Sequence, residues 1–125
     1  MFKEFMLVGM GSFFGGGMRF LLSKLIQSWA FVQFPLGTFA VNILGCLLLG
    51  FLSGLPVNIG WLSPSARLIL TTGFCGGFTT FSTFMHENSS FLHNDSYLSL
   101  LLYVAASLSL GLFAVIGGHQ LARVL

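Results

Sequence analysis

One segment of the chain, Thr71–Phe84, combines residue types that can build an ion site inside a membrane. It reads TTGFCGGFTTFSTF and holds three glycines, five threonines and four phenylalanines. Each glycine inside a helix costs about 1 kcal/mol relative to alanine, so the pair Gly76-Gly77 favours a break in the helix. Lipid cannot satisfy the backbone groups that a break frees, and carbonyl oxygens of Gly76 and Thr79 could then hold a cation. The alternative is that the glycines only allow close helix packing, and the residues favour neither interpretation.

The residues after the glycines form two stripes at helical spacing. Thr80, Thr83 and Glu87 are spaced i, i+3 and i+7, which predicts one helix face with a hydroxyl-lined track. Phe81 and Phe84 share the neighbouring face, and the positive edges of two phenyl rings can meet an anion without a full positive charge. The alternative for these phenylalanines is simple packing against lipid or core.

Polar side chains in the other apolar stretches could complete such a path. Asn42 is a lone amide in GTFAVNILG, and its NH2 group can donate to another helix or to a passing anion. Tyr103 and Ser107 lie one helical turn apart and present hydroxyls on one face. Arg19, in GGGMRF, can either extend to lipid headgroups or raise the anion concentration at an entrance.

Other kinds of chemistry have little support in the sequence. Cys46 and Cys75 lack C-x-x-C spacing and are interpreted as buried, unreactive thiols. No phosphate-binding loop, nucleophile–base pair or paired carboxylates are found, so we expect no enzyme activity. A formal net charge of +2 without a Lys/Arg run argues against binding to nucleic acid.

The composition indicates which elements position these residues. Of 125 residues 55% are hydrophobic and 6% are charged, where a water-soluble domain carries about a quarter charged residues. We therefore expect one all-α transmembrane domain, residues 1–125, in a cell membrane such as a bacterial inner membrane.

A helix needs roughly 20 apolar residues to cross the hydrocarbon core. Four stretches qualify: Phe5–Leu22, Phe34–Leu55, Ser65–His86 and Tyr97–Gly118. The polar segment His86–Ser96 is predicted to be a loop.

Charges at the span ends give almost no preferred orientation. Four spans place both termini and the second loop on one side with Lys3, Arg67 and Arg123, against Arg19 and Lys24 on the other. Orientation depends on such Lys/Arg bias, so insertion in both directions is expected. Four packed helices also fill their own centre with side chains and leave no pore. Both arguments favour an antiparallel homodimer with paths near its interface.

Three motifs, GGGMRF, GTFAVNILG and GFCGGFTTFSTF, resemble the CrcB/Fluc family of fluoride channels, and the four-span layout matches over essentially the whole chain. The resemblance implies an antiparallel, dual-topology homodimer that exports fluoride passively through two pores and so relieves fluoride toxicity. It implies a central structural sodium ion held by the carbonyls of Gly76 and Thr79. It further implies a fluoride path along a set of side chains, with Arg19 and Glu87 at the vestibules: Asn42, Thr80, Phe81, Thr83, Phe84, Tyr103 and Ser107. Gly111 stands where this family commonly has a second hydroxyl beyond Ser107, so the fourth span is the weakest part of the resemblance.

Two other functions fit a small four-span protein. A small multidrug antiporter uses a mid-membrane glutamate in its first span, whereas this first span has only Glu4, at its start. A non-transporting membrane subunit would use the glycines for assembly alone.

Overall fold

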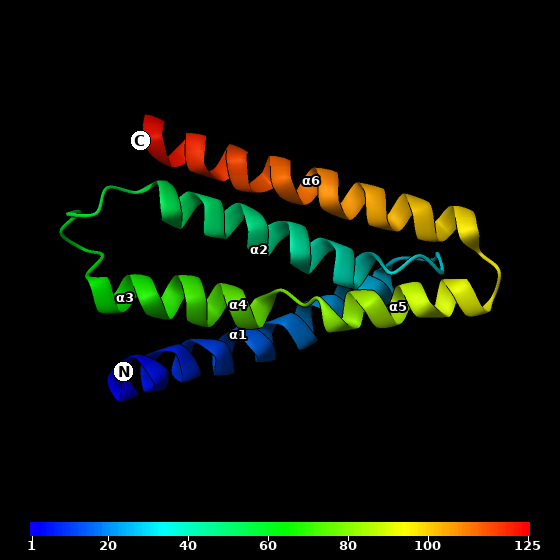
Figure 1. Ribbon diagram of the computed structural model, residues 1–125, viewed down its shortest axis with the longest axis horizontal. Coiled ribbons are helices and arrows are strands. Elements are labelled where there is room, and N and C mark those ends of the chain that lie inside the picture. The colour runs from blue at the N-terminus through cyan, green and yellow to red at the C-terminus, as the bar shows by residue number, and fades with distance from the viewer.

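The computed structural model describes residues 1–125 and contains only helices and their connections (Figure 1). Helix α1 spans Phe2–Trp29, α2 spans Leu36–Gly54 and α6 spans Tyr97–Val124. A segmented helix between α2 and α6 covers Pro64–His93, in the order α3 (Pro64–Leu68), η1 (Ile69–Cys75), α4 (Gly76–Phe78) and α5 (Ser82–His93). These four helices are long and apolar enough to cross a membrane, which confirms the four predicted spans.

The predicted loop His86–Ser96 is wrong for most of its length. Helix α5 continues to His93, and only Asn94–Ser96 joins it to α6. Asp95 in that turn has a φ of 55°, a left-handed conformation that Asp tolerates better than most residues. The polar segment that was predicted to be a loop is therefore the hydrophilic end of a helix. Helix α1 likewise extends beyond the predicted end at Leu22, to Trp29. There Gln27 Nε2 donates to the carbonyls of Val32 and Phe34, and its Oε1 accepts from the Gly37 amide.

The break in the third span is present but does not fall at Gly76-Gly77. Both glycines are helical, and the interruption comes at Thr79–Phe81, where Thr79 is extended with φ −93° and ψ 158°. Gly77 is needed for close packing, because a Cβ there would lie 2.8 Å from the Ser12 carbonyl oxygen of α1. The preceding η1 has the wide turns of a π-helix, a feature often found at functional sites. Both interpretations of the glycines are therefore correct in part: Gly77 allows close packing with α1, and the helix breaks shortly after it, at Thr79–Phe81.

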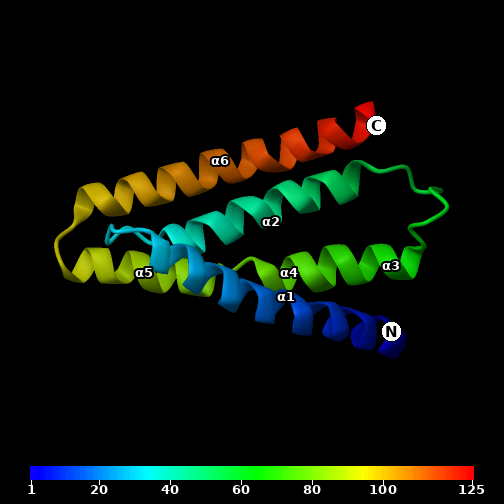
Figure 2. The same cartoon turned by 180° about the vertical axis from the view of Figure 1, so that it is seen from behind.

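The helices form an elongated bundle in which α2 lies along α6, while α1 packs obliquely on η1 and α4 (Figures 1 and 2). Both termini and the connection between α2 and α3 lie at one end, as the even number of spans predicts. Glycines make the α1 contact close: a Cβ on Gly11 would press on the Ile69 carbonyl, and one on Gly15 on the Phe74 carbonyl.

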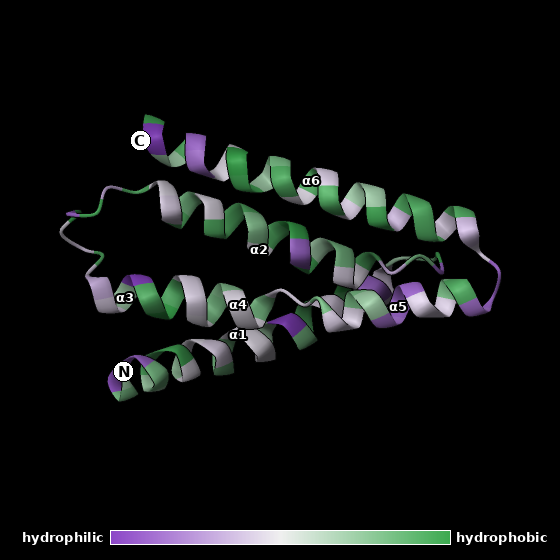
Figure 3. Cartoon of the chain, viewed as in Figure 1, coloured by the Kyte–Doolittle hydropathy of each residue, from purple (hydrophilic) through white to green (hydrophobic).

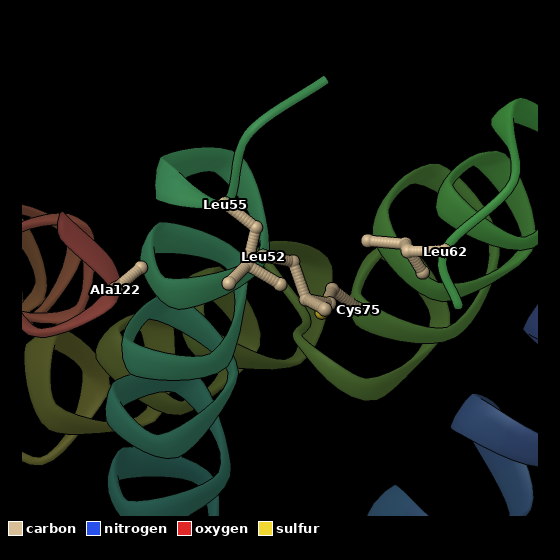
Figure 4. Packing of buried hydrophobic residues seen from close by; sticks show 5 residues of the cluster. All are labelled: Leu52, Leu55, Leu62, Cys75 and Ala122. Atoms are coloured by element: carbon tan, nitrogen blue, oxygen red, sulfur yellow. The ribbon is translucent and has the colours of Figure 1, made fainter. Parts of the chain in front are cut away.

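Apolar residues make up most of each helix, and hydrophilic residues lie mostly toward helix ends and in the connections, with a few in mid-helix (Figure 3). Only 19 of 125 residues are buried, so the single chain has little interior of its own. Five buried residues pack at the end that holds the C-terminus (Figure 4): Leu52, Leu55, Leu62, Cys75 and Ala122. Large exposed side chains such as Phe13 and Leu101 require a lipid or protein environment.

Candidate functional site

Asn42 holds the interrupted segment of the third span from the side of α2. Its Nδ2 donates to the Thr80 carbonyl oxygen at 3.1 Å, and its Oδ1 accepts from the Thr80 amide at 2.7 Å. The side chain thus replaces both bonds that the Thr80 backbone would make in a continuous helix. Of the two alternatives for Asn42, the hydrogen bond to another helix is therefore present. One of its two Nδ2 hydrogens has no acceptor within the chain.

Arg19 holds the same segment from the side of α1. Its Nε donates to the Gly77 carbonyl oxygen at 3.2 Å, so the side chain turns inward. The break explains this position, because Gly77 would otherwise be served by the amide of Phe81, which lies outside any helix. The other four N–H groups of the guanidinium have no recorded partner within the chain. Arg19 therefore supports the broken segment, and these four groups remain available either to lipid headgroups or to an anion at an entrance.

The two carbonyls predicted to hold a cation lose their helical partners at the break. In a continuous helix Gly76 and Thr79 would accept from the amides of Thr80 and Thr83. The Thr80 amide donates instead to Asn42, and the Thr83 amide donates to the Thr80 Oγ1 at 3.3 Å. Both Gly76 and Thr79 line a groove of about 810 Å³ between α2, the third span and α6. Carbonyl oxygens of this kind are suitable ligands for a hard cation.

Phe81 and Phe84 stand at this groove with different environments. Phe81 caps the start of α5 and is 72% exposed, whereas Phe84 is 5% exposed, and their ring centroids lie 6.2 Å apart. Phe84 also meets the Tyr103 ring edge-on at 4.8 Å. One ring is therefore fixed in the chain's interior, and the other is free to meet a partner surface or an ion.

The predicted common face of Thr80, Thr83 and Glu87 is wrong at Thr80, which precedes α5. Glu87 faces inward and joins two helices: Thr38 Oγ1 donates to its Oε2 at 2.7 Å, and Tyr103 Oη donates to its Oε1 at 2.7 Å. Tyr103 is fully buried, and the rings of Phe34, Phe84 and Phe91 meet it edge-on. The carboxylate is therefore an acceptor within the chain.

Thr38 was missed by the sequence analysis, although its position one turn before Asn42 on α2 is a usable signal. Ser107 lines the groove, and its Oγ is buried without a hydrogen-bond partner. Tyr103, one turn away, binds Glu87 and does not line the groove, so the two hydroxyls are not equivalent. An unpaired buried hydroxyl is unusual, and a water or an ion at the groove would satisfy it.

The chain matches known proteins along nearly its whole length. The family model described as "CrcB-like protein, Camphor Resistance (CrcB)" matches residues 6–119. A protein of Chlorobaculum tepidum named "Fluoride-specific ion channel FluC" is 47% identical over 122 residues, which cover 98% of this chain and 96% of that protein. A protein of the same name from Azobacteroides pseudotrichonymphae is 43% identical over 123 residues, 98% of both chains. A third, from Nitratidesulfovibrio vulgaris, is 43% identical over 110 residues, 88% of this chain and 89% of that protein.

Proposed function

This chain belongs to the CrcB-like family, and from that membership we propose that it is a fluoride-specific channel of the cell membrane. It is a multi-pass membrane protein and not an enzyme. The observation that carries the proposal is the broken third span, where Asn42 and Arg19 hold the backbone beside Phe81 and Phe84.

The fluoride path proposed here runs along the groove and the inner face of α5. Fluoride is small and strongly hydrated, so its water must be replaced by well-placed donors and ring edges. Donors are available at Asn42 and at the unpaired hydroxyl of Ser107, and the rings of Phe81 and Phe84 supply positive edges. Thr80 lines the groove, and the Thr83 amide donates to its Oγ1. The Tyr103 ring packs on Phe84, and Tyr103 Oη donates to Glu87.

We further propose that two copies assemble as an antiparallel, dual-topology homodimer with two pores. The proposal is supported by the small buried core, by the open groove and by the exposed Phe81 ring. The nearly equal distribution of Lys and Arg between the two sides permits insertion in both directions. A second copy over the groove would bring a second Gly76 and Thr79 to the same place.

In that dimer a sodium ion would be held by the carbonyl oxygens of Gly76 and Thr79 from both copies. This site is supported by the lost helical bonds of the two carbonyls, because the Thr80 amide donates to Asn42 and the Thr83 amide donates to Thr80 Oγ1. Sodium would supply a fixed positive charge between the two broken spans. A density at bonding distance from these carbonyls in a structure of the purified dimer is the expected observation; its absence at high resolution would remove this part of the proposal.

Fluoride efflux from liposomes tests the function. We expect passive fluoride loss, measured with a fluoride electrode, without any proton gradient and without comparable chloride loss. Efflux that requires a proton gradient, or no efflux, would contradict the channel. The multidrug antiporter is disfavoured because Glu4, the only carboxylate of α1, is exposed at the start of that helix and not in its middle.

Phe81→Ile tests the proposed path. It removes a ring edge but keeps an apolar side chain, so fluoride efflux should fall below detection while the dimer remains intact by size-exclusion chromatography. Phe13→Ile is the matched control, because Phe13 is 76% exposed on α1, away from the groove. Wild-type efflux in Phe81→Ile would refute the role assigned to this ring.

A further inference from the structure

Arg67 is the only charged side chain that lines the groove. The other lining residues are apolar or neutral polar, and the chain's one ion pair, between Met1 and Glu4, lies elsewhere. Arg67 belongs to α3, whereas Phe81 and Phe84 lie beyond the break, so the two ends of the groove differ in charge (Figure 1). A cation without a carboxylate partner leaves this end of the groove positive.

The hydrogen bonds of Arg67 account for only part of its binding capacity. Nη1 donates to the Leu52 carbonyl at 2.6 Å, and Nη2 donates to the carbonyls of Leu55 at 3.3 Å and Pro56 at 2.8 Å. Leu52 lies in the last turn of α2, and Leu55 and Pro56 follow its end, where a helix carries about half a negative charge. A guanidinium has five N–H groups, so Nε–H and one Nη1–H remain without a recorded partner. The positive charge is therefore reduced but not cancelled.

Two hydroxyls without a hydrogen bond in the chain line the same groove as Arg67. Ser53 follows Leu52 on α2, Thr72 lies in η1, and neither side chain has a recorded hydrogen bond within the chain, although both line the groove. Thr71, in contrast, is occupied, because its Oγ1 donates to the Arg67 carbonyl at 2.8 Å. Guanidinium N–H and hydroxyl O–H groups together are the donors that a small anion needs when it gives up water.

We propose that Arg67, with Ser53 and Thr72, forms an anion-binding station at the α3 end of the groove. Its ligand is a small monovalent anion, and under the proposed function, on which this inference rests, that anion is fluoride. The station concentrates the anion at one mouth of the groove and is separate from the ring pair beyond the break. Capping of α2 is the second role of the same side chain.

Charge and geometry can be separated at Arg67 by two substitutions. Arg67→Lys keeps the positive charge but loses the planar fork, and Arg67→Gln keeps hydrogen bonding but loses the charge. Initial fluoride efflux would be measured for both and for the wild type in liposomes, at low and at high concentrations of an impermeant salt. We expect Arg67→Gln to lower efflux by at least about threefold at low salt, and Arg67→Lys, which keeps the charge but loses the planar donor set, to lower it clearly less. The difference should vanish near 1 M salt, where the screening length is about 3 Å.

Ser53→Asp provides a test that leaves the cap of α2 in place, since Ser53 is exposed and its side chain makes no recorded bond. The new carboxylate would pair with Arg67, and we expect low-salt efflux to fall as in Arg67→Gln, whereas the isosteric variant Ser53→Asn, which keeps a donor and adds no charge, should lower it clearly less. If Arg67→Gln does not fold, the comparison of Ser53→Asp with Ser53→Asn decides whether the station exists. Equal loss in Arg67→Lys and Arg67→Gln without salt dependence, together with normal efflux in Ser53→Asp, would overturn the station and leave only the cap. Absence of fluoride efflux in the wild type would instead overturn the proposed function.

Discussion

Replacement of Asn42 by Ala tests whether this side chain holds the break in the third span. The wild-type amide makes two bonds to one residue, 2.7 Å to the Thr80 amide and 3.1 Å from Nδ2 to the Thr80 carbonyl. Ala removes both and offers no substitute within the chain. The Thr80 backbone would then be left unpaired in a segment surrounded by apolar helices.

The expected magnitude follows from these two bonds. A side-chain hydrogen bond between helices in a membrane contributes about 1–2 kcal/mol in model peptides, with measured averages nearer 0.6 kcal/mol. Two bonds lost at once predict a local destabilisation of about 1–4 kcal/mol. Since about 1.4 kcal/mol is a factor of ten, opening of the segment Thr79–Phe84 should increase by roughly 5- to 1,000-fold.

Hydrogen exchange of a peptide that covers Thr79–Phe84 measures this opening directly, and fluoride efflux measures its consequence. Asn42→Ala should exchange faster in this peptide, conduct poorly and melt at a lower temperature in detergent. Asn42→Asp should exchange at an intermediate rate, because a carboxylate still accepts from the Thr80 amide but cannot donate to its carbonyl. Asn58→Ala, in the exposed connection before α3, is the control and should match the wild type. Unchanged exchange in Asn42→Ala would refute the assigned role of the side chain.

Two further predictions concern packing and the carboxylate. Gly15→Ala should destabilise the protein by about 1–3 kcal/mol in thermal melts, because its Cβ would meet the backbone of the third span, whereas Gly16→Ala has open space and should be neutral or slightly stabilising. Equal melting temperatures for the two variants would contradict the close approach of α1. Tyr103→Phe removes the donor to Glu87 and should destabilise by about 1.5–3 kcal/mol and slow fluoride efflux, while Tyr97→Phe, whose hydroxyl binds the exposed Asp95, should do neither. Normal efflux and stability in the Tyr103 variant would show that Glu87 does not need this donor.

The sequence predicted the helices well and their ends poorly. Apolar length alone identifies a membrane span, so all four were found. Polarity at a span end does not distinguish a loop from a helix that leaves the membrane, and for this reason His86–His93 was assigned to a loop although it is helical. The break was predicted near its true place because glycine pairs weaken helices, but its position at Thr79–Phe81 depends on Asn42 from another helix.

The sequence by itself determined the class of protein, the number of spans, the unusual composition of the third span and the resemblance to the fluoride channels. These follow from local properties, namely side-chain polarity, helix propensity and motif identity. The tertiary structure decided which polar groups meet: Arg19 with Gly77, Asn42 with Thr80, and Glu87 with Thr38 and Tyr103. Such pairs join residues far apart in the chain, and the angle and distance between packed helices set them. The same reason explains why Arg67, which the sequence presents only as a charge at a span end, becomes the one cation in the groove once α2, the third span and α6 are assembled.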